Sequence, residues 1–312
     1  MAETAAVRES LRGRFSGTIR EMAPLAEFTT FRIGGPAALL AIPEGKEDLY
    51  MLLQAVGDTG LRPLVLGRGS NVLISDRGFE GVVAVLGNGL QRITKKGKDE
   101  VYVEAGCDLN RLINWAIELG LGGLEDLYGI PGSVGGAVRM NAGAGGSSIG
   151  QSVTRVAVIG LKGGEVEVKE LKRGEIDFSY RYSSIKEGDI VFEAGLQLHA
   201  ADKAALRSRR GEVMAWRREN QPVRQPSAGS VFRNPPGMAA GELIDRCGLK
   251  GARIGGAMVS DKHANFIVNV GGASADDVYR LMMRIKDEVM RREGVELKEE
   301  IRLVGKMGEG AA

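Results

Sequence analysis

Glycine is concentrated in two runs of this chain, and these runs constrain the fold more than any other feature. The chain has 46 glycines among 312 residues, roughly twice the usual share of about 7%. One run is "LVLGRGSNVLIS" (64–75), and the other is "GIPGSVGGAVRMNAGAGGSSIG" (129–150). Because glycine lacks a Cβ and tolerates positive φ, backbone N–H groups in such runs can converge on phosphate oxygens. The two runs therefore predict a phosphate-binding site.

Neither run matches the common nucleotide-binding loops. A Walker loop needs Lys and then Ser or Thr after its last glycine, and neither run has them. Residues 67–72 begin Gly-Arg-Gly, but they lack the last glycine of a dinucleotide fingerprint and no helical pattern follows. ATP hydrolysis and a Rossmann nicotinamide site are therefore disfavoured.

Charge and hydropathy exclude several classes of partner. The net charge is only +2, whereas tracking of nucleic-acid phosphates usually needs a concentrated basic face. Basic clusters at 207–210 and 217–218 are interleaved with Glu212 and Glu219, as on a solvated helix face. No apolar run reaches membrane-spanning length, and the N-terminus lacks an apolar signal core. We expect a cytoplasmic enzyme or binding protein with neither a nucleic-acid nor a membrane partner.

Cysteine and histidine are too sparse for a metal or redox centre. Cys107 and Cys247 each lack a second cysteine nearby, so we expect buried or incidental thiols. The chain has two histidines, which excludes a histidine-rich metal site. His199 lies in an alternating strand and is interpreted as structural, whereas His263 fits core packing and a binding site equally well.

Hydrophobic periodicity predicts an α+β protein made of separate units. Residues 153–198 alternate apolar and polar side chains, which predicts an antiparallel sheet. Asp108 is the expected N-cap of one helix, and Ser274 and Asp277 form a capping box for another. The predicted strands are residues 37–42, 63–66, 72–75, 81–86, 100–105, 265–270 and 299–304, and the predicted helices are residues 47–58, 109–119, 202–219 and 275–293.

Seven motifs occur in an order that resembles a known family. They are "TTFRIGGPA" (29–37), "LGRGSNVL" (66–73), "GIPGSVGGAVRMNAGA" (129–144), "FSYRYS" (178–183), "AGSVFRNP" (228–235), "AGELIDRCGLKGARIGGAMVSDKHANFIVN" (240–269) and "EEIRLVG" (299–305). Together they resemble the UDP-N-acetylenolpyruvoylglucosamine reductases, also called UDP-N-acetylmuramate dehydrogenases, from about residue 20 to residue 305. The short run from Tyr182 to Ile190 lacks the inserted loop of one subtype, so the chain resembles the shorter subtype.

The resemblance implies an α+β fold of the vanillyl-alcohol-oxidase type, in which two subdomains bind FAD and a C-terminal α+β domain binds substrate. The implied divisions are an N-terminal helical extension (1–20), FAD-binding subdomains (21–95 and 96–205), a substrate-binding domain (206–305) and a flexible tail (306–312). We expect a monomer that acts on a small molecule.

The resemblance also assigns the two glycine runs to the pyrophosphate of FAD. Neither histidine falls in these runs, so the resemblance implies non-covalent FAD. We expect a valine at Gly135 to enter the phosphate path and lower FAD occupancy while leaving the fold largely intact. The matching cofactor-binding residues are Gly67, Arg68, Gly69, Ser70, Asn71, Pro131, Gly132, Ser133, Gly135, Gly136, Asn141, Ala142 and Gly143.

Three further positions match the catalytic residues of the family. NADPH is the implied hydride donor to FAD, and the reduced flavin passes hydride to the methylene carbon of UDP-N-acetylglucosamine enolpyruvate. Ser230 lies among small residues and prolines that leave its hydroxyl uncovered, and it matches the proton donor to the resulting carbanion. Arg181 matches the residue that holds the substrate carboxylate, and Glu300 the residue that binds the developing enolic acid.

Some assignments stay open. Glu299 and Glu300 differ by one position, and Glu300 is preferred because Ile301 and Leu303 then share the apolar strand face. Without the resemblance, Arg181 would be interpreted as a surface ion pair. The substrate-binding candidates are Asn234, Lys262 and His263. Two alternatives remain, namely another flavoprotein of this fold, such as an alcohol or sugar oxidase, and a nucleotide-binding module without activity.

Overall fold

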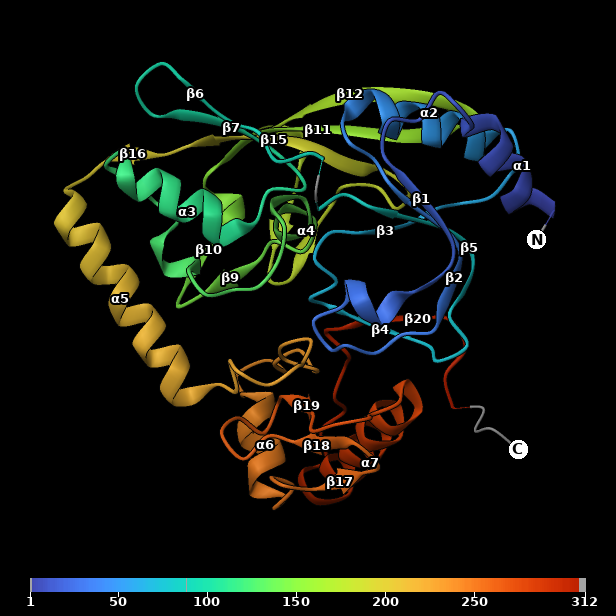
Figure 1. Ribbon diagram of the computed structural model, residues 1–312. Helices are drawn as coiled ribbons and strands as arrows, with labels where there is room; N and C mark the ends of the chain where they lie inside the picture. Colours follow the sequence, from blue (N-terminus) through green and yellow to red (C-terminus); the bar gives the residue numbers. More distant parts are fainter. Residues whose placement is uncertain (1, 88, 309–312) are drawn as a thin grey trace. The chain divides into compact units, whose positions relative to one another are not determined.

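The computed structural model describes residues 2–87 and 89–308, which form two compact units (Figure 1). Unit 1 is made of the described residues of Met1–Met22, Ala38–Arg68 and Glu80–Ala215, and unit 2 of those of Ala23–Ala37, Gly69–Phe79 and Trp216–Ala312. Unit 2 therefore contains two segments from the region 21–95. The predicted tail, residues 306–312, lies partly outside the described residues.

The larger sheet of unit 1 has five strands in the order β12-β11-β15-β7-β6. Neighbouring strands are antiparallel throughout. Helices α3 and α4 lie on one face of this sheet (Figure 1), where Val101, Val103 and Leu196 are buried with them. The strands are β6 (Ile93–Lys96), β7 (Glu100–Glu104), β11 (Val153–Lys162), β12 (Glu165–Lys172) and β15 (Ile190–Gln197), and the helices are α3 (Leu109–Glu118) and α4 (Val134–Arg139).

Helix α2 joins this sheet to a second, four-stranded sheet of order β1-β2-β5-β3. Leu52 and Val56 of α2 pack with α1 against β2 and β5, whereas Leu49 and Leu53 pack on the five-stranded sheet. Helix α2 therefore buries one face in each of two hydrophobic clusters. The elements are α1 (Ala2–Leu11), α2 (Lys46–Gly57), β1 (Thr18–Pro24), β2 (Pro36–Ile42), β3 (Leu64–Leu66) and β5 (Phe79–Val85).

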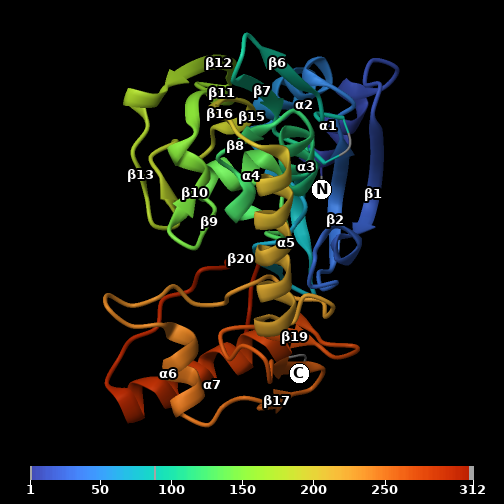
Figure 2. The same cartoon turned by 90° about the vertical axis from the view of Figure 1, so that its left-hand side faces the viewer.

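Short strand pairs and single turns of helix complete unit 1. The pairs are β8 (Leu121–Gly122) with β16 (His199–Ala200), β9 (Gly143–Ala144) with β10 (Ser147–Ser148), and β13 (Phe178–Ser179) with β14 (Tyr182–Ser183). The 3-10 turns are η2 (Glu125–Leu127), η3 (Ile149–Gln151) and η4 (Arg173–Glu175). Helix α5 (Lys203–Asn220) starts in unit 1, where Arg207 pairs with Glu118 at the end of α3 (Figure 2).

Unit 2 is built around α7, whose apolar stripe Val278, Leu281, Met282, Ile285 and Val289 is buried. Ser274 accepts a hydrogen bond from the Asp277 N–H (2.9 Å), and Asp277 accepts one from the Ser274 N–H (3.1 Å), which confirms the capping box. The elements are η1 (Leu25–Phe28), β4 (Val72–Ile74), α6 (Ala240–Arg246), β17 (Arg253–Ile254), β18 (Ala257–Val259), β19 (Ile267–Asn269), α7 (Ala275–Glu293) and β20 (Arg302–Val304).

The structure confirms most of the predicted elements. All four predicted helices form, as α2, α3, α5 and α7, and residues 153–198 contain the antiparallel strands β11, β12 and β15. Asp108 caps α3 by accepting the Arg111 N–H at 2.9 Å. The last strand is shorter than predicted, because β20 begins at Arg302. No helix in the described part of the chain is long and apolar enough to cross a membrane.

Candidate functional site

The two glycine runs meet within unit 1. A Cβ at Gly67 would overlap the Oγ of Ser133, so only a glycine allows the first run to approach the second this closely. Arg68 Nε lies 3.2 Å from Oδ2 of Asp108, and Asp108 forms a β-bridge with Ser133. The part of the first run in unit 1 therefore lies directly beside the loop that starts α4.

Three of the amides at the start of α4 are already used by the protein. One of them, the Gly136 N–H, donates to Ser133 Oγ at 3.3 Å, and the other two bond backbone carbonyls. The Val134 N–H donates to Cys107 O and the Gly135 N–H donates to Ala105 O, both at 2.8 Å. A Cβ at Gly135 would lie 2.7 Å from the Ala105 Cβ, inside van der Waals contact. The expectation that valine at Gly135 would spare the fold is therefore wrong, because Gly135 faces the interior of unit 1.

Gly136 has the environment that was expected for Gly135. It is exposed, and the nearest atom to an added Cβ is Ser133 Oγ at 3.5 Å, an ordinary contact distance. The loop before it is held by Asn110, whose amide donates to Ile130 O (3.1 Å) and accepts from the Gly129 N–H (2.6 Å). An open glycine on a loop fixed from behind suits the approach of a phosphate group.

The remainder of the first run, Gly69–Asn71, belongs to unit 2. Gly69 has φ +58 and its carbonyl accepts the Thr30 N–H at 3.1 Å. Asn71 donates from Nδ2 to Glu300 O (3.2 Å), and its own carbonyl accepts the Arg302 N–H (2.9 Å). Asn71 thus connects the predicted cofactor loop to the segment that carries a predicted catalytic carboxyl.

Ser230 lies on an irregular segment that unit 2 holds on both sides. On one side the Val231 N–H donates to Asn265 O at 2.8 Å. The buried Asn265 side chain also bonds both backbone groups of Phe232, accepting from its N–H (2.9 Å) and donating to its carbonyl (2.8 Å). The backbone next to Ser230 is therefore fixed although it belongs to no regular sheet.

Glu300 lies on the other side of the same segment. Its N–H donates to Val231 O at 2.7 Å, so two of the three predicted catalytic residues are on directly paired backbone. Glu299 instead pairs with Lys286 on α7, at 2.6 Å. Burial acts to raise the pKa of Glu299, but the Lys286 hydrogen bond and a backbone hydrogen bond outweigh it and the pKa is lowered. The choice of Glu300 as the catalytic carboxyl stays a prediction.

Arg181 lies in unit 1, at the second position of the two-residue turn between β13 and β14. The pairing of Ser179 with Tyr182 defines this turn. Arg181 has φ +55, a conformation in which glycine or asparagine is normal. Its Nη1 donates to Gly143 O at 2.9 Å, and its guanidinium lies 5.1 Å from the Tyr180 ring centroid.

The three substrate-binding candidates all lie in unit 2 and make contacts within it. Asn234 Oδ1 accepts the Ala240 N–H at the start of α6 (3.0 Å), and Lys262 Nζ donates to Arg218 O (2.7 Å). His263 Nδ1 accepts the Asn265 N–H at 3.2 Å. Burial, and then the charge of Lys250, lower the pKa of His263, so its neutral form is favoured.

Both cysteines are buried, as predicted. Burial raises the pKa of Cys107 to about 11, so its thiolate is disfavoured at neutral pH. Among the described residues, no group of three or more His, Cys, Asp or Glu side chains is arranged to hold a metal ion.

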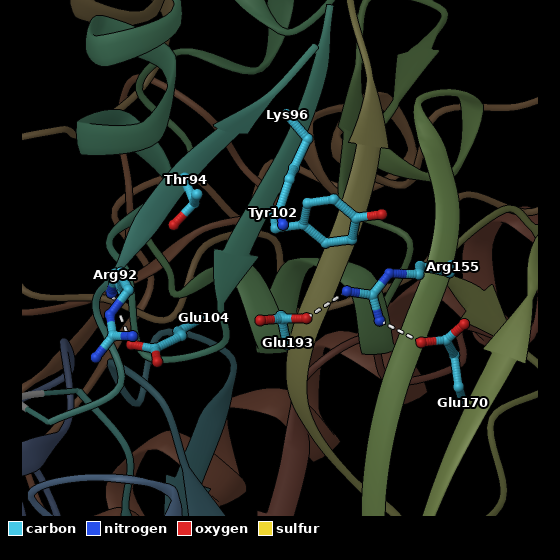
Figure 3. A pocket seen from close by; sticks show the side chains of 8 residues that line it. All are labelled: Arg92, Thr94, Lys96, Tyr102, Glu104, Arg155, Glu170 and Glu193. Atoms are coloured by element: carbon cyan, nitrogen blue, oxygen red, sulfur yellow. Dashed lines mark hydrogen bonds and ion pairs between the residues drawn. The ribbon is translucent and has the colours of Figure 1, made fainter.

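A pocket of about 490 Å³ lies on the sheet face of unit 1 that is opposite α3 and α4 (Figure 3). Arg155 of this pocket pairs with Glu170 and Glu193, and stacks on Tyr102 with Cζ 4.1 Å from the ring centroid. Its lining residues are Arg92, Thr94, Lys96, Tyr102, Glu104, Arg155, Glu170 and Glu193. None of these residues was predicted from the sequence to be functional.

Comparison with known proteins identifies the family. A description of the FAD binding domain matches residues 37–169, and one of the C-terminal domain of UDP-N-acetylenolpyruvoylglucosamine reductase matches residues 221–304. The UDP-N-acetylenolpyruvoylglucosamine reductase of Heliobacterium modesticaldum is 43% identical, over 94% of this chain and 93% of that relative. This chain belongs to the UDP-N-acetylenolpyruvoylglucosamine reductase family. Its Carboxydothermus hydrogenoformans member is 40% identical, over 97% of this chain and 99% of that relative.

A solved structure of the same family confirms the fold. The crystal structure of UDP-N-acetylenolpyruvylglucosamine reductase from Thermus caldophilus matches with a TM-score of 0.78 and 38% identity, covering 93% of this chain and 99% of that one. The predicted FAD-binding α+β fold with a C-terminal domain of this family is therefore confirmed, and the protein is an oxidoreductase that binds FAD.

Sequence reasoning missed the two asparagines that hold the site loops from behind. Asn110 and Asn265 both bond backbone groups next to predicted functional residues. Asn265 stands in "DKHANF" and Asn110 in an amphipathic helix. Neither position differs in sequence from an ordinary polar residue, so the signal exists only in three dimensions.

Proposed function

We propose that this enzyme reduces UDP-N-acetylglucosamine enolpyruvate to UDP-N-acetylmuramate, a step of peptidoglycan precursor synthesis, with FAD as cofactor and NADPH as hydride donor. The observation that carries the proposal is the direct pairing of the Ser230 segment with Glu300, in a chain of this reductase family. The pairing supplies a hydroxyl and a carboxyl on one rigid frame, as protonation of a carbanion requires.

The two glycine runs fit the pyrophosphate of FAD. They approach each other at Gly67 and Ser133, and Arg68 adds a cation beside them. Non-covalent FAD, held by residues 67–71, 131–136 and 141–143, is our proposal for this site. When bound, FAD supplies the capacity to accept and deliver hydride.

The chain's own residues handle charge and the proton on the substrate. Hydride addition to the enolpyruvyl methylene carbon leaves a carbanion on the carbon beside the carboxylate. Oγ of Ser230 then donates a proton to this carbanion. The Arg181 guanidinium binds the carboxylate in a bidentate manner as its charge grows, which a lysine would do less well. The Glu300 carboxyl binds the enolic oxygen. Each interaction strengthens as charge develops, so each favours the transition state over the bound substrate.

Substrate binding is proposed for Asn234, Lys262 and His263 at the nucleotide diphosphate. Asn234 and Lys262 are exposed and lie in unit 2 with Ser230. We further propose that the enzyme works as a monomer in the cytoplasm, where nucleotide-activated sugars and NADPH are available. Size-exclusion chromatography with light scattering checks the monomer.

Stopped-flow absorbance tests the proposal. NADPH added to the oxidised holoenzyme should bleach the flavin band, and UDP-N-acetylglucosamine enolpyruvate added without oxygen should restore it. Rapid reoxidation by oxygen, with no response to the enolpyruvyl substrate, would support a sugar or alcohol oxidase instead. Protein that stays colourless after FAD addition would contradict every flavin-dependent function.

A further inference from the structure

The turn that carries Arg181 adopts a conformation that its own residues do not favour. Arg181 has φ +55, which costs a non-glycine residue of the order of 1 kcal/mol or more. The strands that flank it, β13 and β14, have two residues each. A two-residue strand pair is too short to hold such a turn alone. Contacts from outside the hairpin must therefore fix it.

Three such contacts come from one short segment, residues 139–143. Ser183 Oγ donates to Arg139 O at 2.7 Å, Asn141 Nδ2 donates to Ser179 O at 2.8 Å, and Arg181 Nη1 donates to Gly143 O at 2.9 Å. The three bonds join residues 139, 141 and 143 to residues 183, 179 and 181. The hairpin is thus attached at its base, at its first strand and at its turn.

Asn141 is the side chain that ties this segment together. It is 6% exposed and has φ +44, a conformation that asparagine tolerates better than most residues. Its Oδ1 accepts the Gly150 N–H at 3.0 Å while Nδ2 donates to Ser179 O. Because one partner is a donor and the other an acceptor, the orientation of the amide is fixed. An aspartate would keep the first bond and lose the second.

We propose that Asn141 is a positioning residue for Arg181: its amide holds the β13–β14 turn in the strained conformation from which the guanidinium can bind the substrate carboxylate. The proposal rests on the proposed function of Arg181. It gives the Asn141 side chain a task within the protein, because each end of its amide is bonded to a protein group.

Asn141→Asp tests this with the smallest change, since aspartate has the same shape and also tolerates positive φ. Asn110→Asp is the matched control, because it removes the corresponding bond from Asn110 to Ile130 O and leaves the hairpin untouched. Hydrogen exchange of holoenzyme peptides covering residues 178–183 should become faster in Asn141→Asp and stay unchanged in Asn110→Asp. Equal exchange in Asn141→Asp and the native protein would overturn the proposal. If Asn141→Asp folds poorly, Asn141→Gly keeps the positive φ and serves the same comparison.

The kinetic arm uses Arg181→Ala. Asn141→Asp should slow flavin reoxidation by the enolpyruvyl substrate by roughly ten- to a hundredfold, as loss of positioning does, with little change in flavin reduction by NADPH. In the Arg181→Ala background, Asn141→Asp should slow reoxidation no further, because the two residues act as one unit. Additive losses would overturn the coupling to Arg181. If Arg181→Ala leaves reoxidation unchanged, the function proposed for Arg181 fails, while a faster-exchanging hairpin would still establish that Asn141 positions it.

Discussion

The pocket around Arg155 and the segment around Ser230 differ in how their polar groups are paired. In the pocket, long charged side chains extend from regular strands and pair with one another, as Arg155 does with Glu170 and Glu193 (Figure 3). Around Ser230 the backbone is irregular, and the buried side chain of Asn265 bonds backbone groups. The charges of the pocket are therefore matched by one another.

The two regions satisfy their polar groups by different kinds of contact. Exposed ion pairs on a sheet contribute little to stability, and their charges are already paired without a ligand. A buried amide that holds irregular backbone keeps a neighbouring side chain in one geometry, which a proton donor requires. The proposed function therefore rests on the segment that Asn265 fixes and not on the pocket.

The largest effect is expected at Ser230. Ser230→Ala should slow flavin reoxidation by the enolpyruvyl substrate by about a hundred- to ten-thousandfold, the usual cost of losing a general acid. Flavin reduction by NADPH needs no proton donor to a substrate carbanion, so it should stay near the native rate. Stopped-flow absorbance separates the two half-reactions.

Ser230→Cys provides the control, since a thiol can donate a proton from nearly the same place, and part of the activity should return. An equal loss in both half-reactions would make Ser230 a residue for flavin binding or folding. Normal reoxidation in Ser230→Ala would show that the proton comes from elsewhere, and the contrast with the pocket would lose its functional meaning.

The next largest effects are expected from valine substitutions at the adjacent glycines Gly135 and Gly136. Gly135→Val should destabilise unit 1 by about 1–3 kcal/mol, the usual range for overpacking, because its Cβ would lie 2.7 Å from Ala105 Cβ. Gly136→Val should keep the fold and lower FAD occupancy, because Gly136 is open. Urea denaturation and the flavin absorbance of purified protein measure the two outcomes. Full occupancy in a folded Gly136→Val protein would remove this loop from the proposed cofactor site.

The sequence did not predict that Gly135 is buried and that its neighbour Gly136 is exposed. Periodicity correctly placed the long helices, because burying an amphipathic stripe is a local requirement, as for α7. The resemblance correctly indicated FAD and the reductase family. Which of two adjacent glycines faces the interior depends on Ala105, the residue that follows β7, about thirty residues earlier in the chain. No local pattern records that contact.

The sequence also did not predict the contacts that position the side chains of the proposed site. Asn141 is a predicted cofactor-binding residue, and its sequence motif does not indicate that its amide also bonds Ser179 and Gly150. Arg181 resembles a strand residue in the sequence, whereas the structure places it in a turn at positive φ. These arrangements depend on pairing between distant segments, which composition and periodicity do not encode.

A smaller effect is expected on the pH dependence of stability, through His263, which bonds the Asn265 backbone near Ser230. The pKa of His263 is lowered by burial and then by Lys250, so the unfolded chain binds a proton more readily than the folded one. The stability that follows is complete above the ordinary histidine pKa and is lost as pH falls below it. Protonation also removes the acceptor of the Asn265 N–H. The urea concentration at the unfolding midpoint should therefore decrease as the pH is lowered from 7.5 to 5.5. His263→Gln should make this decrease smaller. An unchanged decrease in His263→Gln would assign the pH dependence to other groups.

The smallest effect is expected in the pocket itself. Arg155→Ala removes two partly exposed ion pairs and the stacking on Tyr102, and it leaves Glu170 and Glu193 without their shared cation. Such pairs contribute about 1 kcal/mol or less, so the denaturation midpoint should fall slightly. Both half-reactions and flavin occupancy should match those of the native enzyme, because no residue of the proposed site lines this pocket. Arg155→Lys is the control, since it keeps the charge but loses the planar fork that reaches both carboxylates. A slower half-reaction in Arg155→Ala, with the fold intact, would connect the outer face to catalysis and reverse the conclusion drawn from the two regions.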